Sequence, residues 1–299
     1  LKSGDMERCM KDFAYHLEEP RVGQSYPNFY AAKLASRFVK VVLAGTGGDE
    51  LFGGYPWRYY RAASSDNFEH YIDNYFAYWQ RLTPNNEISQ LLQPVSSSVG
   101  DINMRQVFQS VFKTHHETLT STEDYINHSL YFEAKTFLPG LLMVEDKLSM
   151  AHSLETRVPF LDNDLVDFAM SLPVKHKLAN LSQTARLNEN VIGKKPQQYF
   201  NQTHDGKLLL RKALAQYMPD RIVKGKKQGF SSPDNCWFKG DSIEFVKRHL
   251  TDKKRSVFNF LDHGYVQQKL TAHLNGQQNN RLFIWSVLNF EYWCQSNGF

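Results

Sequence analysis

Residues 41–55 constrain this chain more than any other stretch, because a short apolar run leads there directly into a loop of glycines and acidic residues. Val41–Leu43 has the brief, β-branched composition of a buried strand that a glycine closes. Glycines in such a loop let the backbone approach closely, and free amide groups favour an anion such as a phosphate. An acidic side chain beside them can hold the Mg²⁺ that accompanies a nucleotide. The sequence therefore predicts a phosphate loop containing Gly45, Gly47 and Gly48, with a metal-binding side chain in the acidic pair Asp49-Glu50.

The loop also has a purely structural interpretation. Its glycines could simply turn the chain from strand to helix, with Asp49 and Glu50 favouring the helix N-terminus through its dipole. The run continues, however, into Leu-Phe-Gly-Gly-Tyr at 51–55, so the distinctive pattern extends over more residues than a turn requires. That length favours a binding loop over a simple turn.

Composition limits the classes of protein to which this chain can belong. Its 299 residues suit one large domain or two modest ones, and a hydrophobic content of 41% is ample for a core. The net charge of +4 is small and scattered, so we expect no nucleic-acid partner. No apolar run approaches the roughly 18 residues of a membrane span, so none is expected. Three cysteines without metal-like spacing fit a reducing environment and predict a cytoplasmic protein.

Outside the first strand the apolar spacing is mainly helical. A phosphate loop normally belongs to a parallel sheet of several strand–helix units, so a nearly solitary strand is unusual. The polar stretches 83–100 and 177–206 are predicted to be loops. Helices are expected over residues 1–19, from Pro27 to Phe38, and over 68–82, 102–119, 123–137, 140–152, 163–172, 207–217, 242–249, 264–274 and 281–295.

Two further segments combine charged residues with a proline or glycine that constrains or turns the backbone. In the first, 152–162, Glu155 and Arg157 stand one residue apart in an extended approach to Pro159. If the Glu155 carboxylate is partly buried, we expect it either to have a functional role or to form a structural ion pair with Arg157. In the second, 226–233, Lys227 precedes a glycine turn, where a lysine could reach a polyphosphate, although a solvated basic turn has the same pattern.

The three segments, in this order and with Asp-Lys-Leu-Ser-Met at 146–150 ahead of the second, strongly resemble the synthetase domain of glutamine-hydrolysing asparagine synthetases. The similarity runs from about residue 15 to near Trp293, which is nearly the whole chain. It implies an α/β fold that is predominantly helical here, the C-terminal part of an adenine-nucleotide α-hydrolase-like domain, also called a PP-loop ATP pyrophosphatase domain.

The resemblance implies a reaction in which ATP adenylates the β-carboxylate of aspartate and ammonia from glutamine then displaces AMP. Ala44, Gly45, Gly47 and Gly48 would lie along the nucleotide, and Asp49 would help to hold Mg²⁺ on the pyrophosphate. Glu155 would line the site where the intermediate reacts. Lys227 would offset charge on the α-phosphate and the leaving pyrophosphate, which adenylation requires.

Thr46 is the residue of this site that departs most from the family pattern, which usually has Glu or Asp there. A carboxylate could act as a base or orient the nucleophile, whereas a threonine hydroxyl cannot be a base at neutral pH. Ala44 also stands where serine is commoner. These changes leave the acceptor open, since relatives close β-lactam rings, cyclise peptides or amidate sugars. A non-catalytic binding module derived from the family is a third alternative.

The family's first pyrophosphate loop, Ser-Gly-Gly-X-Asp-Ser, does not occur in this sequence, and Ser3-Gly4-Asp5 lacks its pattern. The N-terminal glutaminase domain is absent as well. We therefore expect residues 1–299 to be an incomplete asparagine synthetase domain, with about 1–60 the remnant of the nucleotide-binding sheet and about 61–299 the helical part. Such a chain would not make asparagine alone. An exposed strand edge would also favour self-association, for example as a homodimer.

Overall fold

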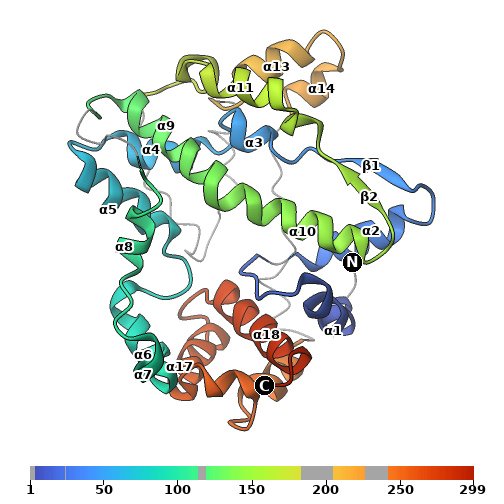
Figure 1. Ribbon diagram of the computed structural model, residues 1–299, viewed down its shortest axis with the longest axis vertical. Helices are drawn as coiled ribbons and strands as arrows, with labels where there is room; N and C mark the ends of the chain where they lie inside the picture. The colour runs from blue at the N-terminus through green and yellow to red at the C-terminus, as the bar shows by residue number, and fades with distance from the viewer. Residues whose placement is uncertain (1–3, 24, 114–118, 183–204, 226–241) are drawn as a thin grey trace.

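The computed structural model describes residues 4–23, 25–113, 119–182, 205–225 and 242–299, and in these ranges the chain is mostly helical (Figure 1). Their sheet consists of two parallel strands, β1 (Val41–Leu43) and β2 (Glu155–Arg157). The prediction of a strand at 41–43 is confirmed. β2 was expected only as extended chain, because its charged residues lack the alternation that identifies a strand.

The expectation that β1 is buried is wrong for the described part of the chain. Val41 is 54% exposed and Leu43 is 75% exposed. The physical reason is that β2 is the one strand pairing with β1 in the described ranges, and nothing there covers the outward side chains. Phe38, just before the strand, is 78% exposed and extends this apolar surface.

Helix α10 (Leu138–Met150) crosses the centre of the molecule and leads into β2 (Figure 1). It continues from α9 (Thr122–Phe132) through a π-helical segment, Glu133–Phe137, so the two helices predicted over 123–137 and 140–152 are joined. Pro139 closely follows the π-helical segment, where the hydrogen-bond ladder of the helix is already altered, so its missing N–H is accommodated there.

The C-terminal helices pack with the first helix into the largest hydrophobic cluster of the described residues. The Phe13 ring meets Trp285 edge-on, with centroids 5.4 Å apart, and Trp285 Nε1 donates to the Arg21 carbonyl at 3.1 Å. The helices expected at both ends of the chain are therefore confirmed and lie together. They are α1 (Asp5–Leu17), α2 (Tyr26–Ala35), α16 (Ile243–Leu250), α17 (His263–Leu274) and α18 (Arg281–Ser296).

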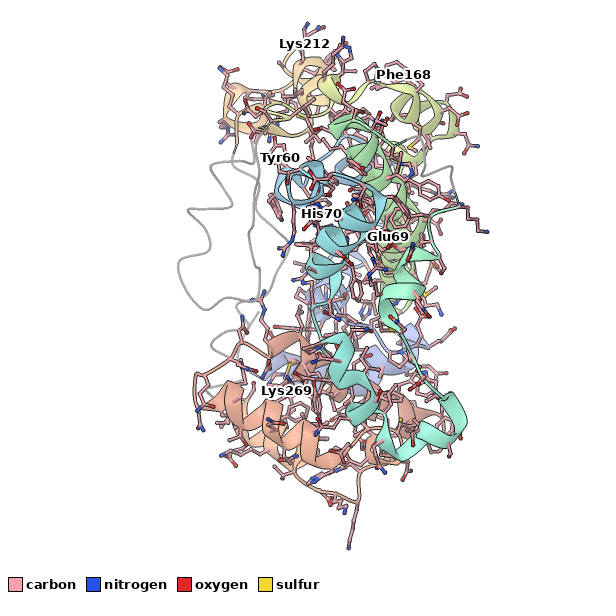
Figure 2. The ribbon with its side chains drawn as sticks, turned by 90° about the vertical axis from the view of Figure 1, so that its left-hand side faces the viewer. Tyr60, Glu69, His70, Phe168, Lys212 and Lys269 are labelled. Carbon is pink, nitrogen blue, oxygen red and sulfur yellow. The ribbon has the colours of Figure 1, made fainter. Side chains whose placement is uncertain are left out.

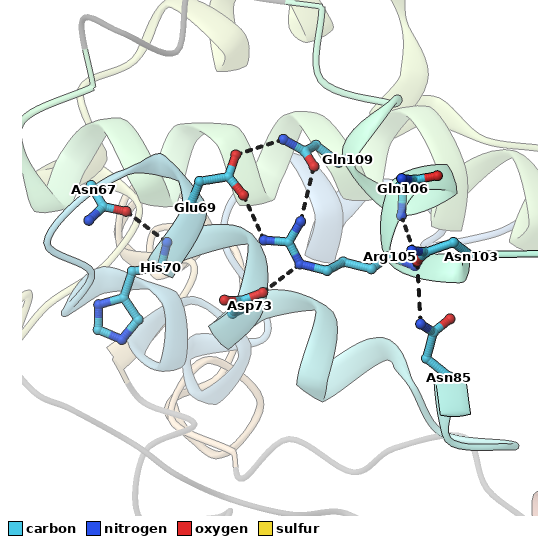
Figure 3. A network of polar contacts seen from close by, with 9 residues as sticks. All are labelled: Asn67, Glu69, His70, Asp73, Asn85, Asn103, Arg105, Gln106 and Gln109. Atoms are coloured by element: carbon cyan, nitrogen blue, oxygen red, sulfur yellow. Dashed lines mark hydrogen bonds and ion pairs between the residues drawn. The ribbon is translucent and has the colours of Figure 1, made fainter. Parts of the chain in front are cut away.

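An aromatic cluster joins α9 to the helices that precede it. On its surface, Arg105 links α8 to α5 by ion pairs with Glu69 at 2.7 Å and Asp73 at 2.6 Å (Figure 3). The Asn103 side chain caps α8 by accepting from the Arg105 and Gln106 amides. The helices of this region are α4 (Pro56–Ala63), α5 (Phe68–Trp79) and α8 (Met104–Gln109), the last much shorter than the predicted 102–119.

The loop prediction for 83–100 is wrong, because short helical turns fill it, including α6 (Ile88–Leu91) and α7 (Ser96–Val99). The remaining elements are α3 (Gly48–Leu51), α11 (Asn163–Ser171), α13 (Leu208–Leu214) and α14 (Asp220–Val223). The molecule is elongated, with Phe168 of α11 and Lys212 of α13 at one end and Lys269 of α17 at the other (Figure 2). None of the helices in the described ranges is long and apolar enough to cross a membrane.

Candidate functional site

The glycine loop lies at the carboxyl end of β1, where open parallel sheets place their ligands. The parallel ladder pairs Val41 with Glu155 and Leu43 with Arg157. It ends with the Ala44 amide, which donates to the Arg157 carbonyl at 2.8 Å. The chain then turns, with the Gly48 amide donating to the Gly45 carbonyl at 3.3 Å, and enters α3.

The consecutive amide groups of Gly45, Thr46 and Gly47 donate no hydrogen bond to any residue that the structure describes. The space beside Gly45 is open, since a Cβ added there would meet nothing within 4 Å. Consecutive amides that donate to no described residue, next to open space at Gly45, are suited to an anion with several oxygen atoms.

Packing against the second motif explains why glycine is needed at 47 and 48. Gly47 has a φ of 94°, and a Cβ there would lie 2.5 Å from the Leu161 side chain. A Cβ on Gly48 would lie 3.2 Å from the Phe160 ring. The turn Pro159–Leu161 therefore packs against Gly47 and Gly48, so the structure brings the first two sequence motifs into contact.

Asp49 is held in place from two directions. Its carbonyl accepts a hydrogen bond from the Gly54 amide at 2.7 Å. Its carboxylate packs against Gly54, with Oδ1 only 1.8 Å from the position that a Cβ on Gly54 would occupy. Its Oδ1 forms an ion pair with Lys207 Nζ at 2.7 Å, while the Lys207 amide donates to the Phe52 carbonyl at 3.0 Å. Sequence reasoning missed Lys207, because nothing in the local pattern relates it to a loop so far away along the chain.

Thr46 has a partner on the central helix. Its hydroxyl donates a hydrogen bond to Glu145 Oε2, and Glu145 is half-buried on α10. Sequence reasoning missed this residue too. Its position directly before the 146–150 motif was the one available signal.

The structure does not place the Glu155 carboxylate at the loop. Glu155 pairs with Val41, at the opposite end of β1 from Thr46. Its carboxylate forms an ion pair with Arg157 at 3.3 Å, and their side chains are 45% and 68% exposed. Lys227 lies outside the described residues, so its role stays a prediction.

A buried network of charged and aromatic side chains includes Glu50 of α3. Glu50 is only 3% exposed and accepts from the Tyr55 hydroxyl at 2.9 Å. The Arg58 guanidinium lies 3.8 Å from the centre of the Tyr55 ring and 3.3 Å from the Glu133 carboxylate. Burial raises the pKa of Glu133, against the opposing effect of Arg58 and of hydroxyl donors from Tyr59 and Tyr75. Glu133 begins the π-helical segment that precedes α10, so the network fixes the loop relative to the helix that carries Glu145.

No group of three or more His, Cys, Asp or Glu side chains in the described ranges could hold a metal ion by itself. A cation at the loop would therefore take Asp49 together with ligand oxygens. Mg²⁺ commonly binds proteins in this way, through one or two carboxylates plus substrate phosphates.

A sequence model of the asparagine synthase family matches residues 1–295, which is almost the whole chain. This chain belongs to the asparagine synthase family. The resemblance inferred from the three motifs is thereby confirmed. Family membership also implies the adenine-nucleotide α-hydrolase-like fold, of which the described residues show the two-stranded parallel sheet and the helical part.

Several curated proteins are similar to this chain, two of the three named here over most of its length. Asparagine synthetase [glutamine-hydrolyzing] 1 of Bacillus subtilis is 28% identical over 95% of the chain. A putative asparagine synthetase [glutamine-hydrolyzing] of Mycobacterium tuberculosis is 24% identical over 98% of it. The chain spans 45% of the length of each of these two relatives. The amidase chyE of Penicillium rubens is 23% identical over 51% of the chain.

Proposed function

We propose that this chain is part of the synthetase domain of a glutamine-hydrolysing asparagine synthetase, and that the loop at 44–49 binds the phosphates of ATP. The observation that carries the proposal is the row of amides at Gly45, Thr46 and Gly47 that donate to no residue in the described ranges, with Asp49 close behind them in the sequence. This arrangement lies at the carboxyl end of a parallel strand in a chain that a synthetase family matches throughout. Its spacing and chemistry fit a polyphosphate and its metal.

The residues present fit MgATP. The amides of the loop would bind phosphate oxygens, and the open space beside Gly45 leaves room for the nucleotide. Asp49 would supply the protein carboxylate for Mg²⁺, which the metal would share with Lys207 or take over from it. The metal would supply charge neutralisation for the departing pyrophosphate. Lys227 is proposed to do the same at the α-phosphate.

The proposed reaction has two steps. In the first, a carboxylate oxygen of aspartate forms a bond to the α-phosphorus of ATP, and the bond to pyrophosphate breaks. In the second, ammonia forms a bond to the acyl carbon, AMP leaves with the electron pair of the broken C–O bond, and nitrogen loses a proton. Catalysis of both steps depends on positioning and on charge, which the rigid loop and its neighbours can supply.

We propose further that the chain functions within a longer cytoplasmic protein that also carries a glutaminase domain. Two facts support this: the chain spans less than half of the length of the relatives named above, and the apolar residues of β1 are exposed. Additional strand–helix units would pair with the free edge of β1, and their helices would cover the face that carries Val41 and Leu43. In the isolated chain, the same surface would favour a homodimer.

A different acceptor is the second candidate function. It is favoured by one observation, the hydroxyl at position 46 in place of an acid, and one comparison, the amidase that is similar to half of the chain. This alternative keeps the adenylation chemistry and changes only the carboxylic acid that is activated. A non-catalytic module is the third candidate, and it predicts no turnover of ATP at all.

The decisive experiment supplies the full-length protein with MgATP and individual carboxylic acids and follows release of pyrophosphate. Aspartate-dependent release, lost in Asp49→Asn, is the expected result. Release with another acid but not with aspartate would remove asparagine synthetase from consideration, and no release with any acid would leave the non-catalytic module. The purified 299-residue chain should make no asparagine.

A further inference from the structure

The hydrogen bond from Thr46 to Glu145 assigns a role to the central helix that the loop itself cannot fill. We infer that Glu145 is the proton acceptor of the amide-forming step, acting through the Thr46 hydroxyl. This inference rests on the proposed function. It adds a residue that lies in none of the three motifs and that sequence reasoning did not select.

The amide-forming step needs such a group. Attack by neutral ammonia on an acyl adenylate gives a nitrogen with three hydrogens and a positive charge, and one proton must leave before the amide is formed. Within the open loop 44–47, Thr46 has the one side chain that can exchange a proton, since the others are alanine and glycine. A hydroxyl that donates its own proton to a carboxylate can accept one from nitrogen in the same step.

The other acidic side chains nearby already have partners. Asp49 is in an ion pair with Lys207 and is the candidate metal ligand. Glu50 is buried and accepts the Tyr55 hydroxyl. Glu155 lies at the far end of β1 in an ion pair with Arg157. Glu145 is thus the carboxylate that contacts the open part of the loop among the described residues.

The proton route balances the chemistry. The C–N bond forms as the C–O bond to AMP breaks, and the electron pair of that bond leaves with the phosphate of AMP. The nitrogen proton passes to Thr46 Oγ1, whose own proton passes to Glu145 Oε2 along the hydrogen bond already present. Solvent then removes the proton from the carboxyl group, which returns the pair to its starting state.

The test separates the two steps in the full-length protein. Exchange of labelled pyrophosphate into ATP reports adenylation, and amide formation from added ammonia reports the second step. Glu145→Gln keeps the size of the side chain and its ability to accept the Thr46 hydrogen bond, but it cannot take up a proton. We expect it to slow amide formation about 10²- to 10³-fold and to change exchange by less than about twofold.

Two further variants make the test specific. Glu123→Gln is the matched control, because Glu123 is an exposed glutamate on α9, and it should leave both steps unchanged. The double variant Thr46→Glu with Glu145→Gln moves the carboxylate into the loop, and it should regain about tenfold or more of the rate that Glu145→Gln loses.

Equal loss of both steps in Glu145→Gln would make the residue structural or part of the nucleotide site and would overturn the inference. An unchanged rate of amide formation would overturn it as well. If the wild-type protein shows no exchange with any acid, the proposed function itself fails, so the two failures are distinguishable.

Discussion

The ammonium group of Lys207 lies 2.7 Å from the carboxylate of Asp49, so the residue best placed to bind a metal at the loop already carries a cation. Neither partner is free to move far. The Lys207 amide is bonded to the Phe52 carbonyl, and the Asp49 carboxylate is folded against Gly54. A metal must therefore share this carboxylate with Lys207 or displace it.

Replacement of Lys207 by methionine should consequently ease metal binding. Both side chains are about a quarter exposed, so the ion pair is of modest strength, about 0.5–1 kcal/mol. We expect Lys207→Met to lower the Mg²⁺ concentration that half-saturates pyrophosphate exchange by about twofold to fivefold at fixed ATP. An increase in that concentration would show instead that Lys207 assists the metal or the phosphates.

The glycines of the loop should differ in what they contribute. Gly47→Ala places a Cβ against Leu161 at a φ of 94°, and we expect it to destabilise the fold by about 1–3 kcal/mol. Gly45→Ala meets no atom within 4 Å, so it should leave thermal stability unchanged but weaken ATP binding by filling the open space. Thermal unfolding and ATP titration of both variants check the pair, and equal destabilisation by the two would contradict it.

Much of this site was predictable from the sequence, and the rest was hidden for physical reasons. The loop and β1 were predictable because a β-branched run followed by glycines is typical of a strand that ends in a turn. Lys207 and Glu145 were not, because their contacts with the loop depend on how distant helices pack. β2 was missed because Glu155–Arg157 is too short and charged to alternate.

The helical part divides in the same way. The apolar spacing of 163–172 correctly predicted α11, and the structure assigns its cap to Asp162, whose carboxylate accepts from the Leu165 amide. Short turns such as α6 and α7 have no long apolar period, so the stretch 83–100 was taken for a loop. An exposed strand edge was expected, but not the exposure of the Val41 and Leu43 side chains, because composition identifies an apolar strand and not what covers it.

In the buried ion pair of Arg58 and Glu133, each residue should stabilise the fold chiefly by neutralising the charge of the other. Glu133 is fully buried and Arg58 is 6% exposed, so removing one partner strands a charge in the interior. We expect Glu133→Ala to destabilise the protein by about 3–5 kcal/mol. The double variant with Arg58→Met should be clearly more stable than Glu133→Ala alone, as chemical denaturation would measure. Strict additivity of the two substitutions would contradict this coupling.

Lys177 provides a prediction for pH dependence. Its side chain is 1% exposed, and burial lowers its pKa from 10.5 to about 8. A lysine whose pKa is lowered in the folded state reduces the free energy of unfolding as long as it is protonated in the unfolded chain. This loss of stability is largest below about pH 8 and decreases as the pH rises toward 10.5. Lys177→Met should therefore be more stable than wild type near pH 7, by up to about 3 kcal/mol, with the difference shrinking by pH 10. Denaturation at both pH values checks this, and a difference independent of pH would contradict it.

The central claim is that the full-length protein activates a carboxylic acid by joining it to the α-phosphate of ATP. Aspartate labelled with ¹⁸O in its β-carboxylate tests this directly, because formation of an acyl adenylate leaves a carboxylate oxygen on the phosphorus. Mass spectrometry of the products should find the label in AMP, alongside unlabelled pyrophosphate. Formation of ADP with labelled inorganic phosphate, or of AMP without the label, would contradict the account.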